Sequence, residues 1–284
     1  MPGGEARAAD ALAAATDSFS AVGIETPRLD AELLLAELAG TDRATLIVDR
    51  DLTLEPSVAR AFSEAVRRRL RREPVAYILG SRGFRHIELL VDRRVLIPRP
   101  ETEMLVELAL EVGPTEVLEI GTGSGAIALA VADELPDSRV VATDVSDGAL
   151  EVAIANARRL GLGERVEFRL GSLPEGSARF DLILANLPYV PDSDGLPPEV
   201  GQWEPEGALF GGPDGTDVIA EVLVGIGAAG IEAPVIGLEI GQGQGERVAA
   251  MLRASGWPET EVRLDLAGID RVVVGRRSRP GVDA

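Results

Sequence analysis

Hydrophobic and polar residues change their spacing along this chain, from a helical pattern at the N-terminus to strands alternating with helices further on. In residues 1–75, Leu29, Leu33 and Leu34 recur at helical spacing, and Gly40 ends this stretch. We therefore predict a small helical N-terminal domain over residues 1–75.

A further predicted helix, residues 56–72, combines an apolar stripe with a dense group of arginines. Residues 1–75 have a net charge of −3, from 10 Arg and 13 acids, whereas residues 76–284 have −16, from 18 Arg and 34 acids. Two interpretations stay open: a solvated helix face, which is the commoner case, or a docking surface for an acidic or RNA-bound partner. The arginines are Arg60, Arg67, Arg68, Arg69, Arg71 and Arg72.

Residues 76–100 predict a β-hairpin that links two domains. Apolar and polar residues alternate from Phe84 to Leu89, and a second strand-like run extends from Val91 to Ile97. His86, the one histidine of the chain, lies in this alternation without a partner in the sequence, and we interpret it as a surface or packing residue.

From about Glu116 onward, short apolar strands alternate with helices, which is typical of a parallel, doubly wound α/β sheet. This second domain is predicted over residues 101–284. Residues 265–270 are too short a connection for a parallel crossover, so the last two strands are predicted to be antiparallel. Strands are predicted at 117–120, 139–144, 166–170, 180–185, 234–240, 260–264 and 271–274, and helices at 126–135, 148–160, 216–226 and 245–255.

Composition removes several kinds of chemistry. The chain has 284 residues, a net charge of −19, no Cys and, by inspection, no Lys. Disulfides, thiolate metal sites, cysteine nucleophiles and Schiff-base lysines are therefore excluded, and one His is too few for a multi-histidine metal centre. Acidity on this scale argues against a broad phosphate-binding surface. No apolar run reaches the roughly 20 residues that span a bilayer, and the N-terminus has no signal-peptide pattern, so we expect a cytoplasmic protein.

A glycine-rich loop follows the first strand of the sheet and opens a helix. Gly121, Gly123 and Gly125 let backbone amides approach a ligand at the carboxyl ends of the strands. With Ala126 in third place the loop fits a dinucleotide fingerprint, whereas the glycines after Glu119 are similar to the first motif of S-adenosylmethionine methyltransferases. Asp144 ends the second strand, where an acid accepts hydrogen bonds from ribose hydroxyls. Together these residues indicate an adenosine-containing cofactor without identifying it.

The tetrapeptide Asn186-Leu187-Pro188-Tyr189 follows the fourth strand and resembles the [Asn/Asp]-Pro-Pro-[Tyr/Phe] motif of methyltransferases that act on planar nitrogen. Such a nitrogen is a poor nucleophile because its lone pair is delocalised. An Asn side-chain carbonyl and the next backbone carbonyl can hold both N–H groups and aim the nitrogen, while Tyr189 packs against the flat group. The motif suits a glutamine amide or an adenine amine equally.

The segment Val95-Leu96-Ile97-Pro98-Arg99-Pro100-Glu101-Thr102-Glu103 resembles the hallmark of the HemK/PrmC family, and the likeness extends over nearly the whole chain. The resemblance implies a seven-stranded, Rossmann-like S-adenosylmethionine-dependent methyltransferase sheet, a helical N-terminal substrate-recognition domain and a linking β-hairpin. It implies methylation of the side-chain amide (N5) of the glutamine in the Gly-Gly-Gln motif of peptide-chain release factors. The methyl donor is S-adenosyl-L-methionine, and S-adenosyl-L-homocysteine is the product.

Site roles carry over by position. The loop from Gly121 to Gly125, with Thr122, Gly123 and Ser124 between, is expected at the methionine part of the cofactor, Glu119 beside its amino group and Asp144 at the ribose. The segment from Asn186 to Tyr189 is expected to bind glutamine, with Asn186 and Tyr189 catalytic and Asn186 also against the cofactor. Arg99 and Thr102 lie in a segment expected to close over the site. The family pattern is not followed at two places: Leu187 replaces Pro, and Ser172-Leu173 replaces an Asp-Trp pair near the adenine. Ser172 and Leu173 are still expected to bind the cofactor, with Ser172 hydrogen-bonded to the adenine amino group and Leu173 covering the ring.

Other functions remain as alternatives. A glutamine methyltransferase for a ribosomal protein shares the motif, and the Asn-Leu-Pro-Tyr form also resembles ribosomal-RNA adenine dimethyltransferases. An RNA or DNA adenine methyltransferase is disfavoured by the charge of residues 76–284. A nicotinamide-dependent oxidoreductase or a non-enzymatic adaptor leaves Asn186–Tyr189 unexplained. We expect direct in-line transfer without metal or covalent intermediate, release factors as partners, no stable nucleic-acid or membrane partner, and a monomer.

Overall fold

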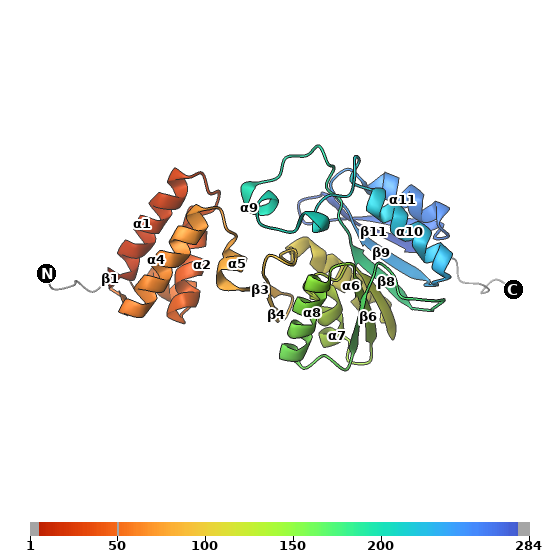
Figure 1. Ribbon diagram of the computed structural model, residues 1–284, viewed down its shortest axis with the longest axis horizontal. Coiled ribbons are helices and arrows are strands. Elements are labelled where there is room, and N and C mark those ends of the chain that lie inside the picture. The colour runs from red at the N-terminus through yellow and green to blue at the C-terminus, as the bar shows by residue number, and fades with distance from the viewer. Residues whose placement is uncertain (1–5, 50, 278–284) are drawn as a thin grey trace. The chain divides into compact units, whose positions relative to one another are not determined.

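The computed structural model describes residues 6–49 and 51–277, and its chain divides into two compact units. One unit consists of Met1–Gly80 together with Leu196–Trp203, and the other of Ser81–Gly195 and Glu204–Ala284. The chain therefore leaves the second unit after Gly195 to contribute a short segment to the first (Figure 1). Within the described residues, no helix has both the length and the apolarity needed to cross a bilayer.

The first unit is helical, as its sequence pattern predicts. Helix α2 begins at Pro27 and ends before Gly40, whose φ of +63° closes the helix in a left-handed cap. Phe19, Leu34 and Phe62 belong to a single apolar cluster that joins the helices. The elements are β1 (Ala6–Arg7), α1 (Ala8–Ala21), α2 (Pro27–Ala39), α3 (Arg43–Val48), β2 (Thr53–Leu54), α4 (Pro56–Leu70), α5 (Val75–Leu79) and, from the inserted segment, α9 (Pro198–Gly201).

The arginines of α4 do not form one surface. Arg69 is 5% exposed, and its guanidinium donates to Asp30 Oδ2 at 2.7 Å and to Glu199 Oε1 at 2.9 Å. Arg72 donates to the other Glu199 oxygen, also at 2.9 Å. Both interpretations offered for this helix are therefore wrong for Arg69, which is neither solvated nor available for docking, because a buried charge requires paired neighbours. Arg67 remains exposed beside Glu64.

The second unit opens with a hairpin of β3 (Ser81–Phe84) and β4 (Ile87–Leu90). The hairpin was predicted, but its bounds were not. Arg85, with a φ of +51°, turns the chain inside the first predicted strand and bonds to Glu134 at 2.8 and 2.7 Å.

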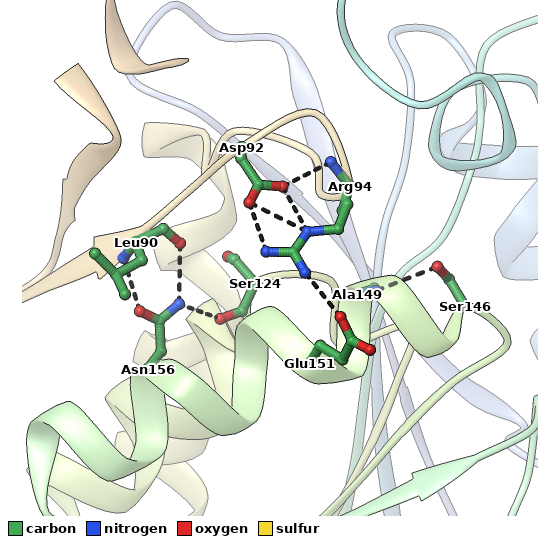
Figure 2. Close-up of polar contacts among 8 residues, drawn as sticks. All are labelled: Leu90, Asp92, Arg94, Ser124, Ser146, Ala149, Glu151 and Asn156. Carbon is green, nitrogen blue, oxygen red and sulfur yellow. Dashed lines mark hydrogen bonds and ion pairs between the residues drawn. The ribbon is translucent and has the colours of Figure 1, made fainter. Parts of the chain in front are cut away.

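The second predicted strand, 91–97, is wrong. Asp92 instead accepts the amide of Arg94 at 3.0 Å and so closes a turn. Its carboxylate also binds the guanidinium of Arg94, which reaches on to Glu151 at 2.8 Å (Figure 2). Val91, Val95 and Ile97 are buried individually, which explains why the segment imitates a strand pattern.

A seven-stranded sheet in the order β10-β11-β9-β8-β5-β6-β7 confirms the predicted α/β fold. Five strands are parallel, and β10 and β11 are antiparallel to their neighbours, as predicted for the final pair. The strands are β5 (Glu116–Ile120), β6 (Arg139–Asp144), β7 (Val166–Leu170), β8 (Leu182–Asn186), β9 (Val235–Glu239), β10 (Glu259–Leu264) and β11 (Asp270–Arg276).

Helices cover both faces of the sheet. Successive strand residues point to opposite faces, so Val117 joins one apolar cluster and Leu118 the other. The first cluster includes α6 (Glu103–Val112), α7 (Ala126–Glu134) and α8 (Asp147–Leu160), and the second includes α10 (Asp217–Ala229) and α11 (Gly245–Ala254). Strands β6 and β8 flank β5 on opposite sides, which makes the carboxyl end of β5 a switch point of the topology and the expected position of a ligand crevice.

Candidate active site

A cavity of about 510 Å³ lies at these strand ends. Most of the residues singled out from the sequence line it: Glu119, Gly121, Thr122, Gly123, Ser124, Asp144, Ser172, Asn186, Leu187 and Pro188. Arg99 and Thr102 line it as well, so the segment expected to close over the site borders the same space. Gly125, Leu173 and Tyr189 are not among the lining residues.

The glycine loop needs glycine for two different reasons. Gly121 has a φ of +76°, and an added Cβ would lie 3.2 Å from Leu187 Cδ2 and 3.5 Å from the carbonyl oxygen of Asn186. Gly125 has a φ of +84° and caps α7, and its Cβ would lie 2.9 Å from Leu129. Gly121 therefore lets the loop pack against Asn186-Leu187, while Gly125 supports the fold behind the cavity.

A buried asparagine supports this loop from behind. Asn156 of α8 is 0% exposed and donates from Nδ2 to the carbonyls of Ser124 at 2.9 Å and Leu90 at 3.0 Å (Figure 2). Its Oδ1 accepts the Leu90 amide at 2.7 Å. Asn156 thus ties the hairpin to the glycine loop, and nothing in the spacing of residues near Asn156 indicates this contact.

Glu119 lies at the bottom of the loop with 1% exposure. Its Oε2 accepts from Thr122 Oγ1 at 2.5 Å and from the amide of Ala128 at 3.1 Å. Burial raises the pKa of Glu119 to about 7, against the lowering effect of these two donors. A buried carboxylate at the cavity wall is the chemistry expected for holding a ligand's ammonium group.

Asp144 presents its carboxylate beside the loop. Oδ2 accepts the amide of Gly123 at 2.8 Å, and Oδ1 accepts the amide of Ser146 at 2.9 Å. Each carboxylate oxygen has a further lone pair, so Asp144 can still accept from a pair of ribose hydroxyls. The carboxylates of Glu119 and Asp144, on one cavity, fit the amino and ribose ends of S-adenosylmethionine.

The Asn186 side chain has a defined direction. Its Nδ2 donates to Thr102 Oγ1 at 3.1 Å. Within the described residues, neither Asn186 Oδ1 nor the Leu187 carbonyl accepts a hydrogen bond. Two acceptors from consecutive residues are thus available at the cavity wall.

Leu187 takes the place of proline without disturbing this arrangement. Its side chain is 6% exposed and joins the apolar cluster beneath α10 and α11. The side chain is thereby directed into the core beside Gly121, and the backbone carbonyl remains free for the role expected of this position.

Tyr189 contacts a residue that sequence reasoning missed. Its hydroxyl lies 3.4 Å from Glu239 Oε1, at the end of β9, and burial raises the pKa of Tyr189. The Tyr189 carbonyl accepts from Gln244 Nε2 at 2.9 Å. Glu239 ends a predicted strand and could have been noticed as an acid at a strand's carboxyl end, like Asp144. The role of Tyr189 toward a substrate stays a prediction.

Glu204 holds the segment that precedes Thr102. Its side chain is 1% exposed, accepts the amide of Ile97 at 3.0 Å and binds the guanidinium of Arg99. The motif beginning Glu204-Pro205 resembles the family pattern but gave no role for the carboxylate. Its role is to fix the backbone bordering the cavity.

The replacements at 172 and 173 have different outcomes. Ser172 lines the cavity, and its carbonyl accepts from Thr143 Oγ1 at 3.2 Å. Leu173 instead packs against α10, where its Cδ1 would lie 2.8 Å from a Cβ on Gly225. Leu173 is therefore not among the residues that line the cavity, whereas Val145, which is 74% exposed and follows Asp144, does line it.

Comparison with known proteins agrees with this geometry. Residues 10–80 match the PrmC N-terminal domain family, and residues 117–197 match a methyltransferase domain family. A release factor glutamine methyltransferase from Geobacter sulfurreducens is 42% identical over 260 residues, covering 89% of this chain and 91% of the relative. The enzyme of the same name from Moorella thermoacetica is 41% identical, covering 94% and 97%.

The fold has solved counterparts at much lower identity. The catalytic domain of hMettl16, in complex with MAT2A 3′UTR hairpin 1, superposes with a TM-score of 0.54 at 13% identity, covering 82% of this chain and 85% of that one. This likeness confirms the methyltransferase fold, whereas the relatives above align with nearly the whole chain. The chain is a methyltransferase and belongs to the release factor glutamine methyltransferase family.

Proposed function

We propose that this enzyme transfers the methyl group of S-adenosyl-L-methionine to the side-chain amide nitrogen (N5) of the glutamine in the Gly-Gly-Gln motif of peptide-chain release factors. One observation carries the proposal: Asn186 Oδ1 and the Leu187 carbonyl are adjacent, unoccupied acceptors on the cavity that Glu119 and Asp144 also line. The names of relatives that span nearly the whole chain support the same substrate.

The two acceptors suit a primary amide. A glutamine amide has two N–H donors in one plane, and both must be held if the nitrogen is to face the methyl group. Asn186 Oδ1 accepts one N–H and the Leu187 carbonyl accepts the other. As positive charge develops on the nitrogen, these fixed dipoles stabilise it more strongly than bulk water does.

The donor would be held by the glycine loop and its two neighbouring carboxylates, which line the same cavity. S-adenosyl-L-methionine supplies an electrophilic methyl group on its sulfonium, and S-adenosyl-L-homocysteine is the product. Glu119 would bind the donor's amino group, Asp144 its ribose, and the amides of the glycine loop its methionine part. Val145 would cover the adenine in place of the expected Leu173.

Methyl transfer can occur in a single step, without a covalent enzyme intermediate. The glutamine nitrogen forms the N–CH₃ bond as the sulfonium S–CH₃ bond breaks, and the nitrogen then loses one proton to water. The sequence offers neither a cysteine nor a lysine nucleophile for an alternative two-step route. The enzyme's contribution is alignment and electrostatic stabilisation.

Methyl transfer to defined acceptors tests the proposal. The enzyme is incubated with labelled S-adenosyl-L-methionine and a native release factor, its Gly-Gly-Gln glutamine→alanine variant, ribosomal proteins, or adenine-containing RNA. Label on the native release factor alone is the expected result. Equal label on the Gln→Ala variant would refute the glutamine assignment, and label on a ribosomal protein or RNA instead would favour one of the alternatives.

The proposal also covers the setting of the enzyme. We expect a cytoplasmic monomer that binds no nucleic acid stably, because release factors act on cytoplasmic ribosomes and the net charge of −19 repels a phosphate backbone. Light scattering of the purified enzyme with and without RNA distinguishes a monomer from a dimer or a complex.

A further inference from the structure

Glu239 is a buried carboxylate immediately behind the two acceptors. It ends β9 and lies opposite Asn186 in the parallel register between β8 and β9. The residue is 1% exposed, and Oε2 has no hydrogen-bond partner within the described residues. An incompletely paired carboxylate destabilises a fold, since an apolar side chain would pack there without a desolvation cost. Its position points to a role in the reaction.

No cation neutralises Glu239 directly. Within the described part of the chain, no Arg or His nitrogen lies within 4.0 Å of its carboxylate. Arg271 favours the charged form from a distance while bound to Asp265 at 3.0 Å, and Glu101 disfavours it. The Tyr189 hydroxyl donates to Glu239 Oε1 at 3.4 Å, and the Thr102 hydroxyl is near enough to lower the pKa of the carboxyl, so both favour its ionised form.

Thr102 connects this carboxylate to Asn186. A threonine hydroxyl has one proton to donate and lone pairs to accept with. When the proton is directed to Glu239, the oxygen can only accept, and Asn186 Nδ2 is the donor that it receives at 3.1 Å. The amide must then point Oδ1 away from Thr102. If the hydroxyl proton turned toward Asn186 instead, the favoured amide orientation would be the opposite one, with Nδ2 in the place needed for an acceptor.

The same carboxylate also accepts a hydrogen bond from the hydroxyl of Tyr189. Both ends of the Asn186–Tyr189 segment therefore converge on one group, Asn186 through Thr102 and Tyr189 directly. None of these contacts places Glu239 in the cavity, whose lining includes Thr102 and Asn186 but not Glu239. Its influence on a substrate is indirect.

We propose that Glu239 is a positioning residue for methyl transfer: its ionised carboxylate orients the Thr102 hydroxyl, which holds Asn186 with Oδ1 toward the substrate amide. The inference rests on the proposed function for its kinetic consequence, but the orientation of Asn186 belongs to the free enzyme. Burial raises the pKa of Glu239 to about 7, so the orientation depends on pH near neutrality.

The kinetics of conservative variants test whether Glu239 acts on Asn186 through Thr102. Glu239→Gln keeps the shape but can donate to Thr102 as well as accept. Thr102→Val removes the hydroxyl, and Thr102→Ser restores it. With a native release factor and saturating S-adenosyl-L-methionine, we expect kcat to fall about 10- to 100-fold for Glu239→Gln and Thr102→Val, with little change in donor Kd, and to recover in Thr102→Ser. Glu111→Gln, which removes a carboxylate paired with Arg263 at the surface, is the control.

The pH profile separates positioning from packing. Wild-type kcat should rise as pH increases through about 7, since the carboxylate form directs the Thr102 proton, and Glu239→Gln should lose this rise. Saturating donor is required because the pKa of Glu119 lies in the same range. Unchanged kcat in both Glu239→Gln and Thr102→Val, or a pH rise that survives in Glu239→Gln, would overturn the proposal. Should Glu239→Gln fail to fold, the Thr102→Val and Thr102→Ser pair decides alone.

A measurement without substrate keeps this inference distinct from the proposed function. The side-chain amide resonances of Asn186 can be assigned in labelled enzyme by their loss in Asn186→Ala. They should shift with pH through about 7 in wild type and Thr102→Ser but not in Thr102→Val. Asn186 resonances that do not change with pH in the wild-type enzyme would contradict the proposed role of Glu239. A wild-type enzyme that shows the shift but methylates no release factor would refute the proposed function alone.

Discussion

The side chains of Asn186 and Thr102 meet across 84 residues of sequence, with Nδ2 donating to Oγ1 at 3.1 Å. This hydrogen bond joins the strand end that carries the two proposed substrate acceptors to the segment bordering the cavity. Nδ2 of the Asn186 amide is therefore already hydrogen-bonded, whereas Oδ1 remains available to accept from a substrate. The first prediction follows from that division.

Asn186→Ala should abolish most turnover and leave donor binding largely intact. Removal of one well-placed group that stabilises a transition state typically costs on the order of 10²- to 10³-fold in kcat. Asn186→Asp, which keeps an acceptor in the same place, is the matched control and should retain more activity. Single-turnover methyl transfer and donor calorimetry provide the two readouts. Wild-type kcat in Asn186→Ala would show that Asn186 does not hold the amide.

Gly121→Ala should harm catalysis more than Gly123→Ala. Both glycines have positive φ, of +76° and +55°, so each substitution carries backbone strain of about 1–2 kcal/mol. Only at Gly121 would the new Cβ also crowd a neighbour, Leu187 Cδ2 at 3.2 Å, whereas at Gly123 it meets nothing within 4 Å. Denaturant unfolding should give similar stabilities, and kcat should be lower for Gly121→Ala. Equal kcat values would mean that the loop does not position the acceptors.

Arg69→Ala should destabilise the helical unit by about 3–5 kcal/mol, because it leaves the buried Asp30 carboxylate without its cation, whereas Glu199 keeps its pair with Arg72. Arg67→Ala should change stability by less than about 1 kcal/mol, since its pair with Glu64 is exposed. Chemical denaturation followed by circular dichroism compares the two. Similar effects would contradict the distinction between the buried and the exposed arginine.

The docking hypothesis for α4 can now be tested without disturbing its core. Arg60, Arg67 and Arg71 are exposed, unlike Arg69. If they contact an acidic face of the release factor, replacing all three by Glu should raise KM about 10-fold or more and leave kcat nearly unchanged. Replacing them by Gln gives the matched control for loss of charge without reversal. An unchanged KM would leave these arginines as solvated surface.

Donor binding should strengthen as pH rises from about 5.5 to 7.5. Burial raises the pKa of Glu119 from 4.5 to about 7, and only the ionised form attracts the donor's ammonium group. The same shift has the opposite effect on stability: the folded state holds this proton more tightly, so the contribution of Glu119 falls as pH rises between the two values. Calorimetry across this range should show a tighter Kd, and Glu119→Gln should bind weakly at every pH. A pH-independent wild-type Kd would contradict the role of Glu119.

Local patterns predicted much of this structure. The strands at 139–144 and 166–170 have the predicted bounds, because apolar runs between turn residues specify them locally. The glycine loop, Asp144 and Asn186 could be placed at one edge because parallel strands end together. The contacts of Arg69 with Asp30, 39 residues away, and of Asn156 with Leu90, 66 residues away, depend on tertiary packing and leave no periodic trace.

Two errors have the same physical origin. Val91, Val95 and Ile97 alternate like a strand but are anchored one by one against the core. Leu173 follows the third strand, where the family has a residue near the adenine. Its side chain packs against α10, and Val145 lines the cavity. Burial constrains a residue to be apolar without specifying which partner buries it.

The most direct test of the central claim is to locate the transferred methyl group. A native release factor is incubated with the enzyme and S-adenosyl-L-methionine, digested, and sequenced by fragmentation mass spectrometry. A single added methyl group on the side-chain nitrogen of the Gly-Gly-Gln glutamine, absent with Asn186→Ala, is the predicted result. A methyl group on any other residue, or the same yield with Asn186→Ala, would contradict the account.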